Sequence, residues 1–322
     1  MRPLIKPSTQ SLIKMQQSLL ADLSDPLTPT PKDQRAIDQF NTLPREQKIQ
    51  IYLELTPPKP INLYKYFTSP LCFEDNNEIS KRKKWLESIL LNHELYLSSH
   101  TQFNDPFDVY PSYKTDASAN EIKSALRRAY KNLHQLSGRE LKEATATRLI
   151  WALKNKETFI ENNIKSIREI MKDVGIFCFT TDATNILMWS HYAFNHQGIC
   201  LEFDLTEELH LSNLIFDAIY SDTRPKIDPI AEAKPEIFNL TLLRKAKSWE
   251  YEKELRLVVG KLSGSFVKFG ENFLKSVIIG AKASESTISY INEINMKRVQ
   301  KQLPQLQIKN AKLCKTEYKI II

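Results

Sequence analysis

A carboxylate-rich stretch, SWEYEKELRLVVG at residues 248–260, offers the most specific chemistry in this sequence. If it forms an extended strand, alternate residues share one face, which brings together Glu250, Glu252, Glu254 and Arg256. Carboxylates this close repel one another unless cations or hydroxyl donors lie opposite. The stretch is therefore either a solvated strand face with a charge ladder, or a site where a carboxylate stabilises a sugar-like cation during glycosyl transfer.

A second polar cluster is SSHTQFNDPFD at residues 98–108. Ser98 and Ser99 end an expected strand, and Asn104 or Asp105 can bond its own backbone in the turn before the proline. That turn accounts for the segment, although the same groups could orient a ligand. In LYKYF at residues 63–67, Lys65 adds a cation on an earlier strand, a contact for a phosphate or ribose.

The stretch LMWSHYAFNHQG at residues 187–198 holds two histidines. His191 and His196 are five residues apart, so they share neither a helix face nor a strand face. With no HExxH and no paired cysteines, the sequence predicts no metal site. One interpretation is a packed corner of the core. The other is a ligand pocket in which Trp189 or Tyr192 stacks on a flat ring and His191 donates to a phosphate.

Composition excludes several classes of protein. The 42% hydrophobic and 26% charged residues are typical of a globular protein, and no apolar stretch is long enough for a membrane helix. Four scattered cysteines and no secretory signal predict a reduced, cytoplasmic chain without membrane partners, with export by a signal-independent route as the open alternative. Only seven glycines occur, the first at Gly138, so Rossmann and P-loop phosphate sites are excluded. The net charge of +7 suits an anionic ligand such as a dinucleotide or RNA, while the basic run at 81–85 is typical of a solvated helix face.

Periodicity predicts an α+β core preceded by a helical region at 1–55 that a proline-rich break at 56–60 ends. We expect domains at 1–56 and 57–322, the first packing on the core or recognising a partner without adding a strand. Further helices are expected at 78–92, 118–173 (with a break near LSGRE) and 285–302. Strands are expected at 61–67, 93–103, 175–181, 198–205, 254–260, 276–281 and near 311–322. The connector 182–197 is expected to join two adjacent strands and to place His191 and Tyr192 beside Glu254, over Leu187 and Met188.

The quoted stretches also carry a family resemblance. LYKYF, FNDPFD, MWSHYA and WEYEKELR follow one another as in the bacterial family called domain of unknown function 2971, and the sequence is identified as a member over about 60–285. More weakly, the layout resembles the ADP-ribosyltransferase fold, which implies a split mixed β-sheet core with inserted helices. Position by position, the resemblance assigns the basic residue to Lys65, the serine motif to Ser98 or Ser99, and Glu-x-Glu to Glu252 and Glu254. Lysine replaces the usual arginine or histidine, and LSSH is not a complete Ser-Thr-Ser triplet.

This resemblance implies an NAD-using ADP-ribosyltransferase or NAD glycohydrolase, with NAD as substrate and no metal. Glu254 would stabilise the cation left as nicotinamide departs, and Glu252 would orient a protein, nucleic-acid or water acceptor. The nicotinamide would lie near Tyr66 or Trp189 and the pyrophosphate near Lys65 and His191. Further contacts to NAD are expected from Asn104, Asp105, Tyr192 and Arg256. The alternative is a non-catalytic nucleotide-sensing or interaction module of a phage-defence or toxin–antitoxin system, with a partner protein at the N-terminal helices. A third interpretation, a hydrolase or nuclease, has no motif behind it.

Overall fold

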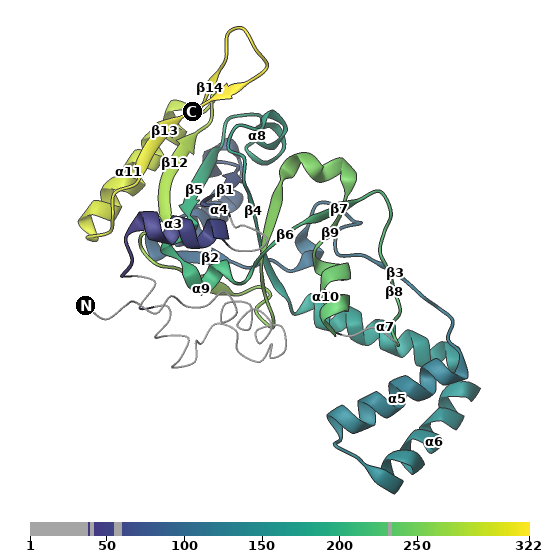
Figure 1. The fold of residues 1–322 in the computed structure, drawn as a ribbon. Helices are drawn as coiled ribbons and strands as arrows, with labels where there is room; N and C mark the ends of the chain where they lie inside the picture. The colour runs from purple at the N-terminus through teal and green to yellow at the C-terminus, as the bar shows by residue number, and fades with distance from the viewer. Residues whose placement is uncertain (1–37, 39–41, 55–59, 231–233) are drawn as a thin grey trace, which may run out of the picture. The chain divides into compact units, whose positions relative to one another are not determined.

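The computed structural model describes residues 38, 42–54, 60–230 and 234–322 (Figure 1). The chain divides into two compact units. The sheet unit comprises the described residues up to Ser99 together with Gly175–Ala218 and Ser248–Ile322. The inserted unit comprises His100–Val174 and Ile219–Lys247, two segments that interrupt the first unit in the sequence. The expected boundary at 56/57 lies outside the described residues.

A mixed sheet of seven strands organises the sheet unit, in the order β13-β12-β5-β1-β4-β10-β6. All neighbouring strands are antiparallel except β12 and β13, which are parallel. The seven strands are β1 (Asn62–Phe67), β4 (Gly175–Thr180), β5 (Ile199–Asp204), β6 (Ile215–Asp217), β10 (Glu254–Val259), β12 (Leu274–Ile279) and β13 (Gln307–Asn310). The α+β class is therefore confirmed.

The sheet order corrects one expectation. The strands at 175–181 and 198–205, β4 and β5, are consecutive in this part of the chain but are not neighbours in the sheet. β1 lies between them, paired with β5 along its whole length and with β4 at Tyr64↔Thr180. A sequence pattern identifies a strand without identifying its partner, so the intervening strand was not anticipated.

One face of this sheet is apolar and carries the main core. Alternate residues of the central strands, among them Leu63, Phe177, Leu201 and Leu257, are buried in it. Two helices contribute to the same core, α4 (Asn76–Asn92) through Leu86, Ile89 and Leu90, and α11 (Glu285–Gln300) through Tyr290, Ile291 and Ile294. The helix α4 starts where the Asp75 side chain accepts a hydrogen bond from the Asn77 N–H.

Shorter elements complete the sheet unit. They are α3 (Arg45–Glu54), η1 (Pro70–Cys72), β2 (Glu94–Tyr96), α8 (Ile186–Tyr192), η3 (Leu205–Glu207), α9 (Leu209–Ser212), η4 (Lys247–Glu252), β11 (Phe266–Lys268), β14 (Lys312–Leu313) and β15 (Ile320–Ile321). The strand expected at 93–103 is only the three residues of β2, which pair with β11 outside the main sheet. The closing strand expected near 311–322 is the β14–β15 pair.

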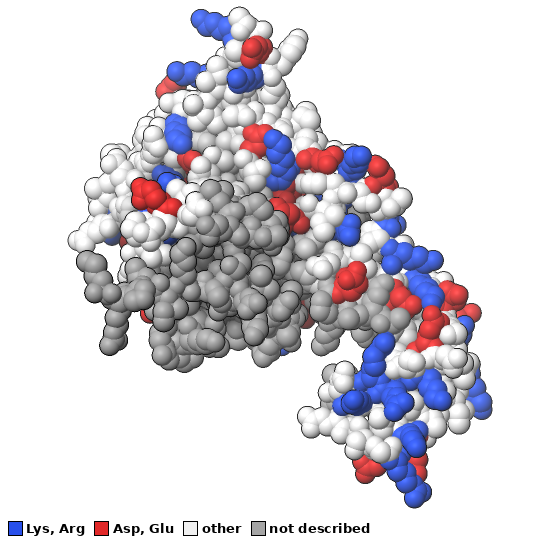
Figure 2. Space-filling view, in the orientation of Figure 1, with Lys and Arg blue, Asp and Glu red and all other residues white. Residues whose placement is uncertain are grey.

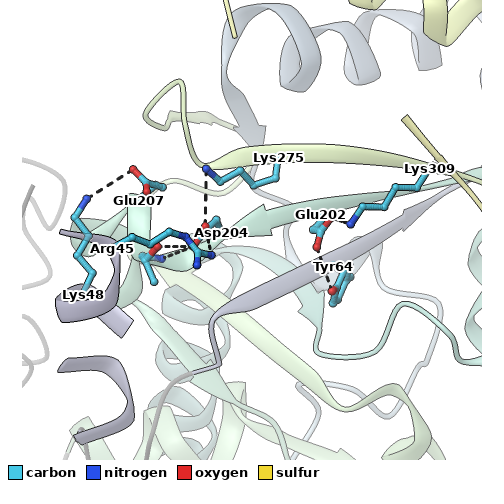
Figure 3. Close-up of polar contacts among 9 residues, drawn as sticks. Arg45, Lys48, Tyr64, Glu202, Asp204, Glu207, Lys275 and Lys309 are labelled. Atoms are coloured by element: carbon cyan, nitrogen blue, oxygen red, sulfur yellow. Dashed lines mark hydrogen bonds and ion pairs between the residues drawn. The ribbon is translucent and has the colours of Figure 1, made fainter. Parts of the chain in front are cut away.

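The described part of the N-terminal region is mainly α3, which packs on the sheet unit and adds no strand. Arg45 Nη2 lies 2.9 Å from Asp204 Oδ2, and Lys48 Nζ lies 3.7 Å from Glu207 Oε2 (Figure 3). Asp204 and Glu207 belong to the end of β5 and to η3, so these ion pairs attach the helix to the sheet. Most of the expected helices before α3 lie outside the described residues.

The inserted unit is mainly helical. Its elements are η2 (His100–Gln102), β3 (Ser112–Tyr113), α5 (Ala119–Leu133), α6 (Gly138–Lys154), α7 (Lys156–Lys172), β7 (Ile219–Ser221), β8 (Lys226–Ile227), α10 (Lys234–Leu242) and β9 (Arg244–Ala246). The helices α5 and α6 pack as a hairpin (Figure 1). The expected break falls at Gly138, whose positive φ of 54° is a conformation that glycine adopts without strain.

Candidate functional site

The face of the sheet opposite the main core carries a row of polar side chains. Directly opposed residues on neighbouring antiparallel strands share a face, and the register joins five of them in sequence. The row consists of Ser276 on β12, Glu202 on β5, Tyr64 on β1, Thr180 on β4 and Glu254 on β10. We call these five residues the polar row. Strands are about 4.8 Å apart, so the backbones of Glu202 and Glu254 lie roughly 14 Å from each other.

At one end of the polar row, Glu202 accepts hydrogen bonds from three donors, of which Figure 3 labels Lys309 and Tyr64. Lys309 Nζ lies 2.6 Å from its Oε2, Ser276 Oγ donates to the same oxygen, and Tyr64 OH donates to Oε1 at 3.4 Å. Burial, followed by the negative charge and hydrogen bond of Glu202, raises the pKa of Tyr64 to about 12. Tyr64 is therefore a neutral donor at physiological pH, and Glu202 is firmly anchored.

At the other end, Glu254 is held by an arginine of its own strand. Arg256 Nε donates to Glu254 Oε1 at 2.9 Å and Nη2 donates to Oε2 at 3.2 Å. Both residues are buried, and Arg256 is completely inaccessible. Cys178 lies opposite Arg256, and burial, followed by the negative charge of Glu254, raises the pKa of its thiol. Cys178 is therefore protonated and does not supply a thiolate nucleophile.

The segment before β10 is not the expected strand. Residues 247–252 form η4, and Lys253 has a positive φ of 44° that turns the chain into β10. Glu250 is consequently exposed, whereas Glu252 is buried. The alternation of charged residues is compatible with a strand. In the structure, contacts with the connector that contains α8 hold residues 247–252 in a 3-10 helix instead.

The connector that contains α8 lies along η4. Its N-cap, Asn185, accepts hydrogen bonds from the Leu187 and Met188 N–H groups and so starts the helix. Four side-chain contacts then join the two segments in order: Asp182 to Lys253 at 2.9 Å, Asn185 Nδ2 to the Tyr251 carbonyl at 2.7 Å, His191 Nδ1 to Tyr251 OH at 3.1 Å, and Tyr192 OH to Glu252 Oε1 at 2.6 Å. His191 and Tyr192 therefore contact Tyr251 and Glu252, which precede Glu254 in the chain.

Trp189 follows the packed-corner interpretation. It is completely buried, donates its Nε1–H to the Ala183 carbonyl at 2.8 Å, and meets the Tyr66 ring edge to face with centroids 5.0 Å apart. Tyr66 is itself buried and donates to the Asp182 carbonyl. Neither ring has an accessible face for a nicotinamide. Leu187, expected beneath this corner, is 46% exposed.

Lys65 does not share a face with Glu254. Tyr64, Thr180 and Glu254 oppose one another, so the neighbouring residue Lys65 points to the other side of the sheet. Its Nζ lies 5.1 Å from the centroid of the Phe177 ring, within the apolar core. The expectation that Lys65 and Glu254 contact the same ligand is therefore wrong, because successive side chains of a strand point to opposite faces of the sheet.

Hydrogen bonds with backbone groups surround Ser98 and Asp105. Ser98 forms an isolated bridge with Ile176, beyond the end of β2, and Ser99 follows it in the sequence. In the inserted unit, Asn104 is exposed, and Asp105 Oδ1 accepts from the Phe107 N–H at 2.8 Å, as the turn interpretation predicts. No group of metal ligands occurs within the described residues. Across the same part of the chain, no helix is long and apolar enough to cross a membrane.

The comparisons with known proteins bear on this arrangement. Residues 188–257 match the model of a family described as "Protein of unknown function (DUF2971)". Over these residues the chain matches the family whose motifs it resembles. No curated protein and no solved structure matches the chain. The matched family segment runs from within α8 through β5 to β10, so it includes Tyr192, Glu202, Glu252 and Glu254.

Sequence reasoning overlooked the Glu202 end of the polar row. The alternation in GICLEFDL placed Glu202 and Asp204 together on the less apolar side of a strand, which was the available signal. The alternation did not identify the donors to Glu202, because Tyr64, Ser276 and Lys309 come from three other strands.

Proposed function

We propose that this protein cleaves the N-glycosidic bond of NAD or a related nucleotide, as an NAD glycohydrolase or ADP-ribosyltransferase. The observation that carries the proposal is the buried Glu252 carboxylate, which accepts a 2.6 Å hydrogen bond from Tyr192 beside the start of β10. A positioned carboxylate in a site of low polarity stabilises a developing oxocarbenium ion strongly. The carboxylate of Glu254, fixed by Arg256, lies two residues further along the chain.

The reaction would run through dissociation of nicotinamide. The bond between the ribose C1′ and the nicotinamide nitrogen breaks, and its electron pair leaves with the neutral ring. Glu252 stabilises the cation at C1′, with Glu254 adding fixed negative charge. Water or an acceptor then bonds to C1′ and gives up its proton to a carboxylate or to solvent. The half-buried tyrosines, Tyr192 and Tyr251, are the nearby aromatic side chains for the leaving ring.

The fold supports the same proposal in one respect. The register joins β1 and β4 at a single pair, Tyr64↔Thr180, whereas β1 and β5 pair at six positions. Two neighbouring strands that pair at only one position, as β1 and β4 do, are compatible with the split sheet of the ADP-ribosyltransferase fold. The basic residue that the resemblance assigned to Lys65 would have to be replaced by another cation.

The test is release of nicotinamide from NAD, measured by chromatography, for the wild type and three matched variants. Glu252→Gln and Glu254→Gln each remove one negative charge and keep the shape, and we expect each to lower kcat by about 100-fold or more. Glu250→Gln, in the same 3-10 helix but exposed, is the control and should keep full activity. Full activity in both buried-site variants, with melting curves showing that they are folded, would refute the assignment.

The second candidate is a nucleotide-sensing or interaction module, as in a phage-defence or toxin–antitoxin system. One observation favours it: both carboxylate oxygens of Glu254 are bound by Arg256, so this charge is already engaged. Calorimetry with NAD distinguishes the two candidates. Saturable binding without nicotinamide release supports the sensor, whereas binding with release supports the enzyme.

A further inference from the structure

The excess positive charge of this chain is concentrated in the α5–α6 hairpin. Residues 119–154 contain eight lysines and arginines and three glutamates, a net charge of +5 out of +7 for the whole chain. All eight basic side chains are exposed. Figure 2 shows Lys and Arg gathered over these two helices. A charge distribution this uneven creates a local positive potential, which the overall composition did not indicate.

Three of these cations form one stripe along α5. Lys123, Arg127 and Lys131 are four residues apart, so they lie on the same side of the helix at intervals of about 6 Å. The exposed residues that flank them on that side, Asn120 and Ser124, are uncharged. We call Lys123, Arg127 and Lys131 the α5 stripe.

The rest of α5 fixes the direction in which the stripe points. On an adjoining side of the helix, Ile122 and Leu126 are buried in the core of the inserted unit. Ser118 caps the N-terminus and forms a capping box with Glu121, the one carboxylate of the helix. Lys114 Nζ lies 2.8 Å from Glu121 Oε1 and compensates its charge. The stripe therefore faces away from the core, and its own helix contributes no uncompensated negative charge to it.

We propose that the α5 stripe is a docking surface for the phosphate backbone of duplex nucleic acid. Regularly spaced cations complement a regular array of phosphates and gain affinity by releasing counterions. A surface for single strands would present free aromatic rings to the bases, whereas Tyr130, the tyrosine of α5, is half-buried against the core of the inserted unit and contacts His134. A membrane-binding helix would present apolar side chains next to its cations, whereas Ile122 and Leu126 are buried. Recognition is through the backbone and independent of base sequence.

The experiment is fluorescence anisotropy of the full-length chain with a labelled 20-base-pair duplex between 50 and 200 mM salt. The triple variant Lys123→Gln/Arg127→Gln/Lys131→Gln removes three phosphate contacts. It should reduce the slope of log K against log salt by about 2.7, because each contact contributes about 0.9. Over that salt range, the wild type should therefore lose about 40-fold more affinity than the variant.

The matched control removes three charges elsewhere, from the basic run of α4, as Lys81→Gln/Lys83→Gln/Lys84→Gln. It should bind like the wild type. Parallel titrations use duplex RNA, the single strand alone, and vesicles containing anionic lipid. Binding of both duplex types identifies the shared phosphate backbone, and binding of one type identifies the source. The proposal is overturned if the wild type does not bind duplex, if the control loses as much affinity as the stripe variant, or if the stripe variant loses binding only to single strands or vesicles.

Discussion

Replacing Arg256 by methionine tests the central electrostatic feature of the candidate site. Arg256 is completely buried and donates two hydrogen bonds to the carboxylate of Glu254, at 2.9 and 3.2 Å. Methionine is unbranched and flexible enough to fill most of the volume that the arginine side chain leaves. The substitution therefore removes the positive charge, and the carboxylate of Glu254 stays in the interior.

Breaking a buried ion pair by removing one partner costs about 3–5 kcal/mol, because the remaining charge is uncompensated. We expect Arg256→Met to lower the free energy of unfolding by that amount. The double variant Glu254→Leu/Arg256→Met should recover most of the loss, because apolar side chains of similar volume often replace a buried pair without penalty.

Urea unfolding followed by tryptophan fluorescence measures the effect. The background substitution Trp151→Phe removes the tryptophan of the inserted unit, so the other three report on the sheet unit. The comparison requires equal slopes of free energy against urea concentration for all variants. A cost below about 1 kcal/mol for Arg256→Met would show that the pair is solvated and would refute the reasoning. A double variant as unstable as the single one would show that Glu254 is not the source of the cost.

Three further predictions concern the surrounding structure. Tyr192→Phe should lower the free energy of unfolding by about 1–3 kcal/mol in urea, because the buried Glu252 carboxylate loses its 2.6 Å donor; an unchanged midpoint would contradict this. Gly198→Ala should lower the melting temperature, because a Cβ there would lie 2.1 Å from the backbone carbonyl oxygen of Phe67; a melting temperature equal to that of the wild type would show that the backbone moves freely. Burial raises the pKa of Asp204, but hydrogen bonds to its carboxylate outweigh this and hold the pKa below its ordinary value. Its contribution to stability is therefore complete above about pH 4 and is lost as the pH falls through the lowered folded pKa. Urea midpoints measured against pH should decline less steeply below pH 4 for Asp204→Asn; an identical decline would exclude this group.

The sequence by itself determined much of the secondary structure. The alternation in INLYKYF and GICLEFDL predicted β1 and β5, and the spacing at 78–92 and 285–302 predicted α4 and α11. Gly138 indicated the break between α5 and α6. These features depend on neighbours a few residues away, so a local pattern is sufficient to specify them. The concentration of charge on α5 and α6 was also present in the sequence, but its orientation required the core that Ile122 and Leu126 form.

The tertiary structure alone decided the strand order and the composition of the candidate site. Glu252 and Tyr192 were both named from the sequence, yet their contact joins residues 60 positions apart. Lys65 was expected to act in the same site as Glu254. The sequence does not show that Tyr64, the residue before it, is the one that opposes Thr180. A shift of one residue in that register exchanges the two faces of the strand. The register is set by packing against the core and by pairing with β4 and β5, two strands more than 100 residues from β1 in the chain.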